Sequence, residues 1–310
     1  MPHPSEQSGR QVFYSHGKLL ISSEYIILDG AESLAVPTQK GQNLEVVQEV
    51  GTRRRIYWKS LNHRDEIWFE CYLDHNFNIL TTTDKAVAET LQKWLLTAAN
   101  LNPMWLIEAG DIEVITQLEF PENWGLGSSS TLLSSIARWA EVDPYQLLWE
   151  AFSGSGYDIA CATAEKPIIY QLQGNQPKVD AVDWNPEFKD DIYFVHLDKK
   201  QRSAKEVVRY RELEINRKDA VKWFTEHNRN LLQLDSLADF VEWCTDHENQ
   251  LSSLLQLKSA REKFVDFDGA VKSLGAWGGD FILAAGKDAP NYFKRKGLQT
   301  VINYREMVLA

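Results

Sequence analysis

Two glycines and a row of hydroxyl residues stand directly before an apolar helical run, and this stretch constrains the fold most. Residues 121–131 read PENWGLGSSST and continue into Leu132, Leu133, Ile136 and Ala137. Glycines let a ligand approach the backbone, and the first turn of a helix offers unpaired N–H groups at a positive dipole end, which suits phosphate. Ser and Thr are also ordinary N-cap residues, so the stretch alone is equally typical of a capped helix after a tight turn.

The composition favours a globular protein and disfavours some classes of binding partner. The chain of 310 residues is 44% hydrophobic and 25% charged, which is ordinary for a globular protein and long enough for two modest domains. Its net charge of −11 disfavours a nucleic-acid or anionic-membrane partner. Scattered cysteines, a polar N-terminus and the lack of any apolar run near ~18 residues favour a cytoplasmic protein.

Strand and helix patterns are interleaved along the whole chain. Strands are expected at residues 11–21, 33–37, 44–50, 54–59, 66–72, 105–107, 112–118, 167–170, 192–197, 270–276, 281–285 and 300–304. Helices are expected after Asp84, from the glycine-serine stretch to about Val142, after Asp143, through most of 207–263, and near Tyr292. Residues 44–72 predict three strands of an antiparallel set. The whole pattern predicts an α+β fold with mostly antiparallel sheets.

Residues 174–185, rich in Pro, Asp and Asn, are the best candidate for a domain boundary. They divide the chain into an N-terminal domain, 1–181, and a C-terminal domain, 182–310.

Three separated segments and a fourth, shorter one occur in an order that can be compared with known sequence motifs. The first is 17–30 (GKLLISSEYIILDG), the second is the glycine-serine stretch, and the third is 272–280 (KSLGAWGGD). Residues 155–158 (SGYD) lie between the second and the third. Together they resemble the signature motifs of the GHMP small-molecule kinases, which include galactokinase, homoserine kinase, mevalonate kinase and phosphomevalonate kinase. The resemblance extends over nearly the whole chain, although residues 207–263 contribute little to it.

The resemblance implies a two-domain GHMP kinase fold. Its N-terminal β/α half would carry the Gly-Ser phosphate loop and bind ATP, and its C-terminal half would be ferredoxin-like. The C-terminal strand would return to the first sheet. The implied reaction transfers the γ-phosphoryl group of ATP to a small-molecule acceptor, in a monomer or a homodimer.

The implied site residues match the needs of phosphoryl transfer, which depends on positioning and on neutralising phosphate charge. Asp158 would take or orient the proton of the acceptor hydroxyl, and Lys18 would lie beside it and stabilise the transferring group. A loop hydroxyl, Ser129, and the carboxylate of Glu150 would hold Mg²⁺. The residues expected to bind ATP are Pro121, Trp124, Gly125, Leu126, Gly127, Ser128, Ser129 and Ser130.

The acceptor is expected to be small and anionic. Glu24 followed by Tyr25 resembles phosphomevalonate kinase more than mevalonate kinase, and Asp280 at the end of the third motif agrees. The basic turn Lys199, Lys200, Arg202 and Lys205 lies where an anionic acceptor would be bound, although such a turn is also typical of a solvated helix start. The residues expected to contact the acceptor are Lys18, Glu24, Tyr25, Gly156, Lys200, Arg202 and Gly278.

Departures from the family pattern leave other interpretations open. Trp124 and Trp277 stand where the family has small residues, so a non-catalytic nucleotide or metabolite sensor on the same fold is one alternative. A diphosphomevalonate decarboxylase-like enzyme, which would release CO₂, is another. Cys244, His247 and Glu248 have a spacing reminiscent of a metal site, but without a second pair they are typical of an exposed helix face.

Overall fold

The computed structural model describes residues 9–49, 54–107, 109–198, 203–275 and 279–310. The chain divides into two compact units. Unit 1 contains Met1–His16, Lys40–Glu122 and Gly127–Gly154, and unit 2 contains Gly17–Gln39, Asn123–Leu126 and Ser155–Ala310. Strands β1 (Gly9–Leu20) and β2 (Ser33–Glu49) contribute residues to both units. The predicted domain boundary at 181/182 stays a prediction.

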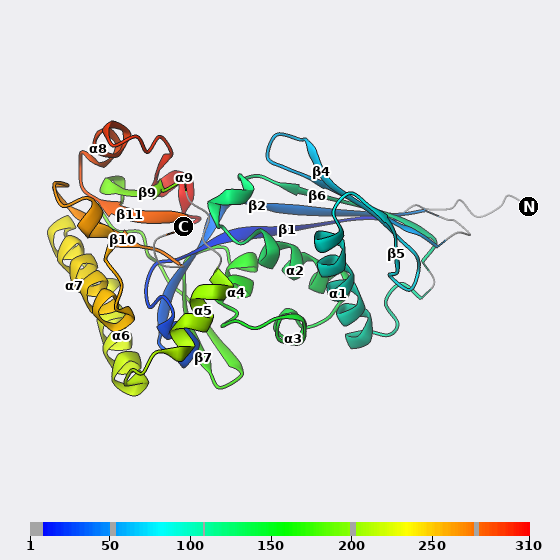
Figure 1. The fold of residues 1–310 in the computed structure, drawn as a ribbon, viewed down its shortest axis with the longest axis horizontal. Helices are drawn as coiled ribbons and strands as arrows, with labels where there is room; N and C mark the ends of the chain where they lie inside the picture. Colours follow the sequence, from blue (N-terminus) through cyan, green and yellow to red (C-terminus); the bar gives the residue numbers. More distant parts are fainter. Residues whose placement is uncertain (1–8, 50–53, 108, 199–202, 276–278) are drawn as a thin grey trace, which may run out of the picture. The chain divides into compact units, whose positions relative to one another are not determined.

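Unit 1 combines a mixed sheet with three helices (Figure 1). Its strands are hydrogen-bonded in the order β5-β4-β3-β6-β2. They are β3 (Ile56–Leu61), β4 (Ile67–Leu73), β5 (Ile79–Thr82) and β6 (Asp111–Leu118). The helices α1 (Lys85–Leu101), α2 (Ser128–Trp139) and α3 (Pro144–Ala151) pack against one another. The side chains of Asp84 and Asp143 accept N–H groups of the first turns of α1 and α3, which is why these helices begin where they do.

One strand prediction in unit 1 is confirmed in part and another is wrong. Residues 44–72 do contribute to three strands, and β3 pairs antiparallel with β4, but β6 lies between β2 and β3 and runs parallel to β3. Residues 105–107 form a turn and not a strand. The turn is closed by the Trp105 N–H donating to the Asn102 carbonyl, and the Trp105 ring packs edge-to-face on Trp139 with centroids 4.7 Å apart.

Unit 2 contains a smaller antiparallel sheet with the strand order β10-β11-β9-β12. These strands are β9 (Ile192–His196), β10 (Ala270–Ser273), β11 (Phe281–Ala285) and β12 (Val301–Asn303). The α-helices are α4 (Tyr157–Thr163), α5 (Ser203–Glu212), α6 (Arg217–Leu231), α7 (Leu237–Leu255), α8 (Ala289–Arg295) and α9 (Tyr304–Met307). Single 3₁₀ turns occur at Ile26–Asp29, Lys189–Asp191 and Ala260–Lys263. The predicted α+β fold with a large and a smaller sheet is confirmed.

The hairpin of β7 (Ile168–Gln173) and β8 (Gln176–Ala181) also belongs to unit 2, where β7 pairs with the first residues of β2. The predicted boundary segment 174–185 therefore contains a strand. After α9 the chain reaches β2 again, since Val308 forms a bridge with Thr38 and the Leu309 N–H donates to the Pro37 carbonyl. The expected return of the C-terminus to the first sheet is thus made by the residues after β12.

Helix α7 carries the packing that bears on the site. It lies beside α6 and against β10 (Figure 1). Leu251 and Leu255 of α7 enter a buried cluster with Phe224 of α6 and with Tyr25 and Ile26, which follow β1. The first motif is therefore packed directly on the helical part of unit 2. None of the helices in the described ranges is both long and apolar enough to cross a membrane.

Candidate active site

The glycine-serine stretch begins α2 without a side-chain cap. Gly127 is the N-cap residue, with φ 87°, and no side chain of the described residues is seen to cap the first turn. The Ser130 hydroxyl donates to the Gly127 carbonyl at 2.9 Å, whereas Ser129 is exposed. The alternative of a helix capped by its own Ser or Thr is therefore wrong, and the first-turn N–H groups of α2 keep the anion-binding potential of a helix N-terminus.

Lys18 is bound to the glycine loop within unit 2. Its backbone N–H donates to the Leu126 carbonyl at 3.0 Å, and its Nζ donates to the Gly125 carbonyl at 2.9 Å. Gly17 permits this approach, because a Cβ at position 17 would come within 3.0 Å of the Leu126 oxygen and 2.5 Å of Thr38 Oγ1. The end of β1 and residues 125–126 thus form one hydrogen-bonded element.

Asp158 lies in the first turn of α4, which starts after Gly156 with φ 85°. One of its oxygens accepts the Ile159 N–H at 3.1 Å. Burial opposes the charge of Lys18, but the neighbouring Tyr157, Asp158 and Asp280 outweigh it and raise the pKa of Lys18. Lys18 and Asp158 are therefore brought within electrostatic reach of each other, as the motifs predicted. Their catalytic roles stay a prediction.

Tyr157, between Gly156 and Asp158, also lies near the ammonium group. Lys18 Nζ is 5.8 Å from the centre of its ring. Burial, opposed by the charge of Lys18, raises the pKa of Tyr157 to about 12. The phenol is therefore neutral at physiological pH.

Trp124 has a defined place in unit 2. Its ring packs edge-to-face on Phe281, with centroids 5.6 Å apart, and lies 6.5 Å from the His196 ring. His196 Nε2 in turn lies 3.0 Å from the carbonyl oxygen of the preceding residue, Asn123. The bulky residue that departs from the family pattern thus anchors the loop to the start of β11. A contact between Trp124 and adenine stays a prediction.

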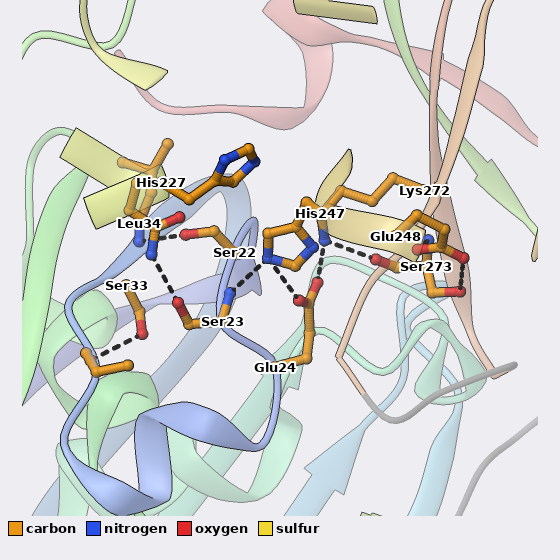
Figure 2. Close-up of polar contacts among 12 residues, drawn as sticks. Ser22, Ser23, Glu24, Ser33, Leu34, His227, His247, Glu248, Lys272 and Ser273 are labelled. Atoms are coloured by element: carbon orange, nitrogen blue, oxygen red, sulfur yellow. Dashed lines mark hydrogen bonds and ion pairs between the residues drawn. The ribbon is translucent and has the colours of Figure 1, made fainter. Parts of the chain in front are cut away.

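Glu24 and Tyr25, expected to contact the acceptor, are both buried. Figure 2 shows Glu24 within a network of buried polar side chains from the first motif, α7 and β10. Glu24 Oε1 accepts Lys272 Nζ, and Lys272 Nζ also donates to the Ser273 carbonyl at 3.0 Å. Burial raises the pKa of Glu24 to about 7, against the attraction of Lys272. One carboxylate oxygen of Glu24 therefore has a hydrogen-bond partner inside the protein, and a contact of Glu24 with the acceptor stays a prediction.

His247 of α7 accepts the Ser23 N–H through Nε2 at 3.0 Å (Figure 2). Glu24 Oε2 lies 3.6 Å from the same nitrogen. Because Nε2 acts as an acceptor and burial lowers the pKa of His247 well below its usual range, the ring is neutral and this contact is no salt bridge.

The expectation that Cys244, His247 and Glu248 form an exposed helix face is wrong, because all three are buried. The carboxylate of Glu248 accepts the Ala260 N–H and both the N–H and the hydroxyl of Ser273, at 2.8–2.9 Å. Glu248 thus bonds β10 and the turn after α7, and His247 bonds the first motif through Ser23. Among the described residues, no cluster of three or more His, Cys, Asp or Glu side chains is arranged to hold a metal ion.

The remaining predicted site residues either belong to unit 1 or lie outside the described residues. Pro121, Ser128, Ser129 and Glu150 belong to unit 1, where Glu150 is an exposed residue of α3 that accepts Gln146 Nε2 at 3.4 Å. Lys200, Arg202, Trp277 and Gly278 lie outside the described residues, and so does Lys199.

The motif comparison did not predict the buried ion pair of Lys272 with Glu24 or the position of the Asp280 carboxylate against Gly125. A lysine inside the short apolar strand β10 was the available signal for Lys272, because a buried charge in a strand requires a partner.

No protein-family model and no curated protein matches the sequence. Solved structures do match the fold. Mevalonate kinase from Methanococcus jannaschii aligns over 97% of this chain and 98% of its own, with a TM-score of 0.67 and 14% identity. Phosphomevalonate kinase from Streptococcus pneumoniae, in complex with phosphomevalonate and AMPPNP, aligns over 94% and 99%, with a TM-score of 0.69 and 15% identity.

Lactococcus lactis galactokinase, complexed with galactose, aligns over 92% of this chain and 88% of its own, with a TM-score of 0.66 and 13% identity. The structural neighbours of this chain are therefore GHMP kinases with different acceptors. At these identities the likeness establishes the fold, in agreement with the resemblance of the motifs.

Proposed function

We propose that the chain is an ATP-dependent kinase that transfers the γ-phosphoryl group to a small anionic acceptor. The observation that carries this proposal is the bond of Lys18 Nζ to the Gly125 carbonyl, with Asp158 in electrostatic reach of the same ammonium. A cation fixed on a glycine loop beside a carboxylate suits both charge neutralisation and proton transfer. The GHMP kinase fold supports the same reaction.

In this reaction the acceptor oxygen forms a bond to the γ-phosphorus while the bond between that phosphorus and the β-γ bridging oxygen breaks, leaving ADP. Asp158 takes the proton of an acceptor hydroxyl or orients it, and Lys18 stabilises charge on the transferring group. The N–H groups of residues 125–129 bind the ATP phosphates. Gly125 and Gly127 both have positive φ, a backbone conformation that glycine adopts without strain.

Mg²⁺ would be held by Ser129 and Glu150 and would neutralise charge on the β- and γ-phosphate oxygens. Their oxygen donors match the preference of this ion, which commonly keeps several waters and binds few protein groups. Ser129 is the better hydroxyl in the loop, because Ser130 already donates to Gly127 and Ser129 is exposed.

We propose phosphomevalonate as the preferred acceptor and mevalonate as the second. Support comes from Glu24-Tyr25 and Asp280 in the motifs and from the phosphomevalonate kinase, bound to phosphomevalonate, among the structural neighbours. A phosphate acceptor, with a second pKa near ~6, is largely ionised at neutral pH and needs Asp158 less as a base than an alcohol does. Lys200 and Arg202 would bind its negative groups.

A coupled ADP-release assay with phosphomevalonate, mevalonate and galactose tests the proposal. We expect acceptor-dependent release of ADP, fastest with phosphomevalonate, and no release of CO₂ from diphosphomevalonate. Nucleotide binding without turnover on any acceptor would instead indicate a sensor. Release of CO₂ would indicate the decarboxylase reaction.

A further inference from the structure

Asp280 is the charged group beside Lys18 that the proposed reaction leaves without a role. We propose, resting on the kinase function above, that Asp280 is a positioning residue. Its carboxylate holds the Gly125 peptide and the Lys18 ammonium in the arrangement that phosphoryl transfer requires. Asp158 is then left to act on the acceptor.

The backbone of Asp280 is fixed by the small sheet. Asp280 directly precedes β11, and its carbonyl accepts the Leu197 N–H at 2.8 Å. The next residue, Phe281, pairs in register with His196 of β9 and packs against Trp124. The start of β11 thus places the Asp280 side chain on the glycine loop.

The carboxylate of Asp280 fills the space that a side chain at position 125 would need. A Cβ on Gly125 would overlap this carboxylate and come within 2.8 Å of the Asp280 Cβ. Gly125 also has φ 64°, a conformation that favours glycine. Because the carbonyl of the same residue accepts Lys18 Nζ, Asp280 packs on the peptide group that holds the lysine.

Asp280 also acts on Lys18 through its charge, and it is one of the groups that raise the pKa of this lysine. Among the described residues, the titratable groups that interact with the buried ammonium are Tyr157, Asp158 and Cys161 from α4 and Asp280 from the start of β11. Burial raises the pKa of the Cys161 thiol, so this group is uncharged. Tyr157 is neutral at physiological pH, so the two carboxylates supply the negative charge that keeps Lys18 protonated despite its burial. One carboxylate comes from residues 155–158 and the other from the third motif, so the charged state of Lys18 does not depend on Asp158 alone.

Asp280 Oδ1 is buried and has no hydrogen-bond partner among the described residues. A buried carboxylate oxygen without a donor costs free energy, and such local costs persist mainly where function requires them. The attraction to Lys18 is the interaction on this side chain that offsets the cost.

The test compares Asp280→Asn, which keeps the shape and removes the charge, with a matched control, Asp288→Asn, at the exposed residue directly before α8. We expect Asp280→Asn to lower kcat by ~10-fold or more while the Kd of AMPPNP, measured by calorimetry, changes by less than ~3-fold. The alkaline limb of the kcat profile moves to lower pH, because Lys18 loses a negative neighbour. Asp288→Asn behaves as the wild type. An unchanged kcat and pH profile would overturn the proposal. A fall in kcat that is matched by a loss of folding stability and of AMPPNP affinity would also overturn it, because the effect would then be structural.

A second measurement does not depend on turnover. The pKa of Lys18 is followed by NMR of isotope-labelled lysine, with its signal assigned from Lys18→Met. Asp280→Asn is expected to lower this pKa, and an unchanged pKa would refute the proposed link. If the wild type shows no kinase activity, the proposed function fails while this measurement still decides whether Asp280 controls Lys18.

Discussion

Lys272 and Glu24 form an ion pair in which neither side chain is exposed, although 248 positions separate them in the sequence. The pair joins β10, which leads toward Asp280, to the segment that follows Lys18. Glu24 lies between Ser23 and Tyr25, which both have positive φ, 60° and 67°. Such strained backbone persists only where surrounding contacts hold it. The pair therefore connects the first and third motifs within unit 2.

Breaking this pair on one side should destabilise the protein strongly. At pH ~8, above the pKa of about 7 of Glu24, Lys272→Met leaves an ionised carboxylate buried without its cation, and we expect the free energy of unfolding to fall by ~3–5 kcal/mol. The double variant Glu24→Met, Lys272→Met removes both charges and should recover most of the loss. Urea denaturation of the three proteins measures this.

The matched control is Lys296→Met, which removes the lysine of an exposed pair with Asp266. Its effect should be small by comparison, because water screens the exposed pair. A Lys272→Met variant as stable as this control would show that the buried pair does not hold the fold.

Stability should depend on pH through Glu24. Burial raises its pKa from 4.5 to about 7, so between these values the folded protein keeps a proton that the unfolded chain releases. The contribution of Glu24 is complete below pH 4.5 and is lost as pH rises to about 7. His247 acts in the opposite direction, since its lowered pKa costs stability as pH falls below 6.5.

The Glu24→Gln variant distinguishes the contribution of Glu24 to the pH dependence of stability from that of His247. We expect the wild type to lose stability relative to this variant as pH increases from 4.5 to 7, measured by thermal unfolding across that range. The exposed Glu242→Gln on the same helix as His247 should follow the wild-type curve. Parallel curves for Glu24→Gln and the wild type would contradict a raised pKa for Glu24.

Local sequence signals predicted the elements whose determinants are local. Asp84 and Asp143 begin helices because their own side chains accept first-turn N–H groups. The motif order predicted that Lys18 and Asp158 approach each other, and the pKa shift of Lys18 agrees. These features depend on a few neighbouring residues or on a pattern shared with known kinases.

Features that depend on residues far away in the sequence could not be predicted from local sequence signals. The spacing of Cys244, His247 and Glu248 is typical of a solvated helix face, but all three are buried, and the buried polar groups of His247 and Glu248 have partners far away in the sequence or beyond the helix end. Strand order has no local signature either, so the insertion of β6 between β2 and β3 was missed. Strand-like residues at Trp105 were overridden by ring packing on Trp139.

Asp158→Ala should lower kcat by several orders of magnitude and leave ATP affinity nearly intact. The reason is that the proposed role of Asp158 belongs to the transition state and not to nucleotide binding. Steady-state kinetics with the best acceptor and calorimetry with AMPPNP measure the two effects. The exposed Asp183→Ala, which loses only a surface pair with Lys166, serves as the control. Equal kcat for both variants would exclude Asp158 as the catalytic acid or base.

Gly127→Val should abolish nucleotide binding. Gly127 starts α2 with φ 87°, and a β-branched residue there costs ~1–3 kcal/mol and places methyl groups beside the first-turn N–H groups that the phosphates need. Gly174→Val is the matched control, because Gly174 also has positive φ, 65°, but lies in the turn between β7 and β8 with open space around it. Both variants pay a similar backbone cost, so circular dichroism should show both folded. Calorimetry with AMPPNP should then detect binding only for Gly174→Val, and normal binding by Gly127→Val would remove the loop from the nucleotide site.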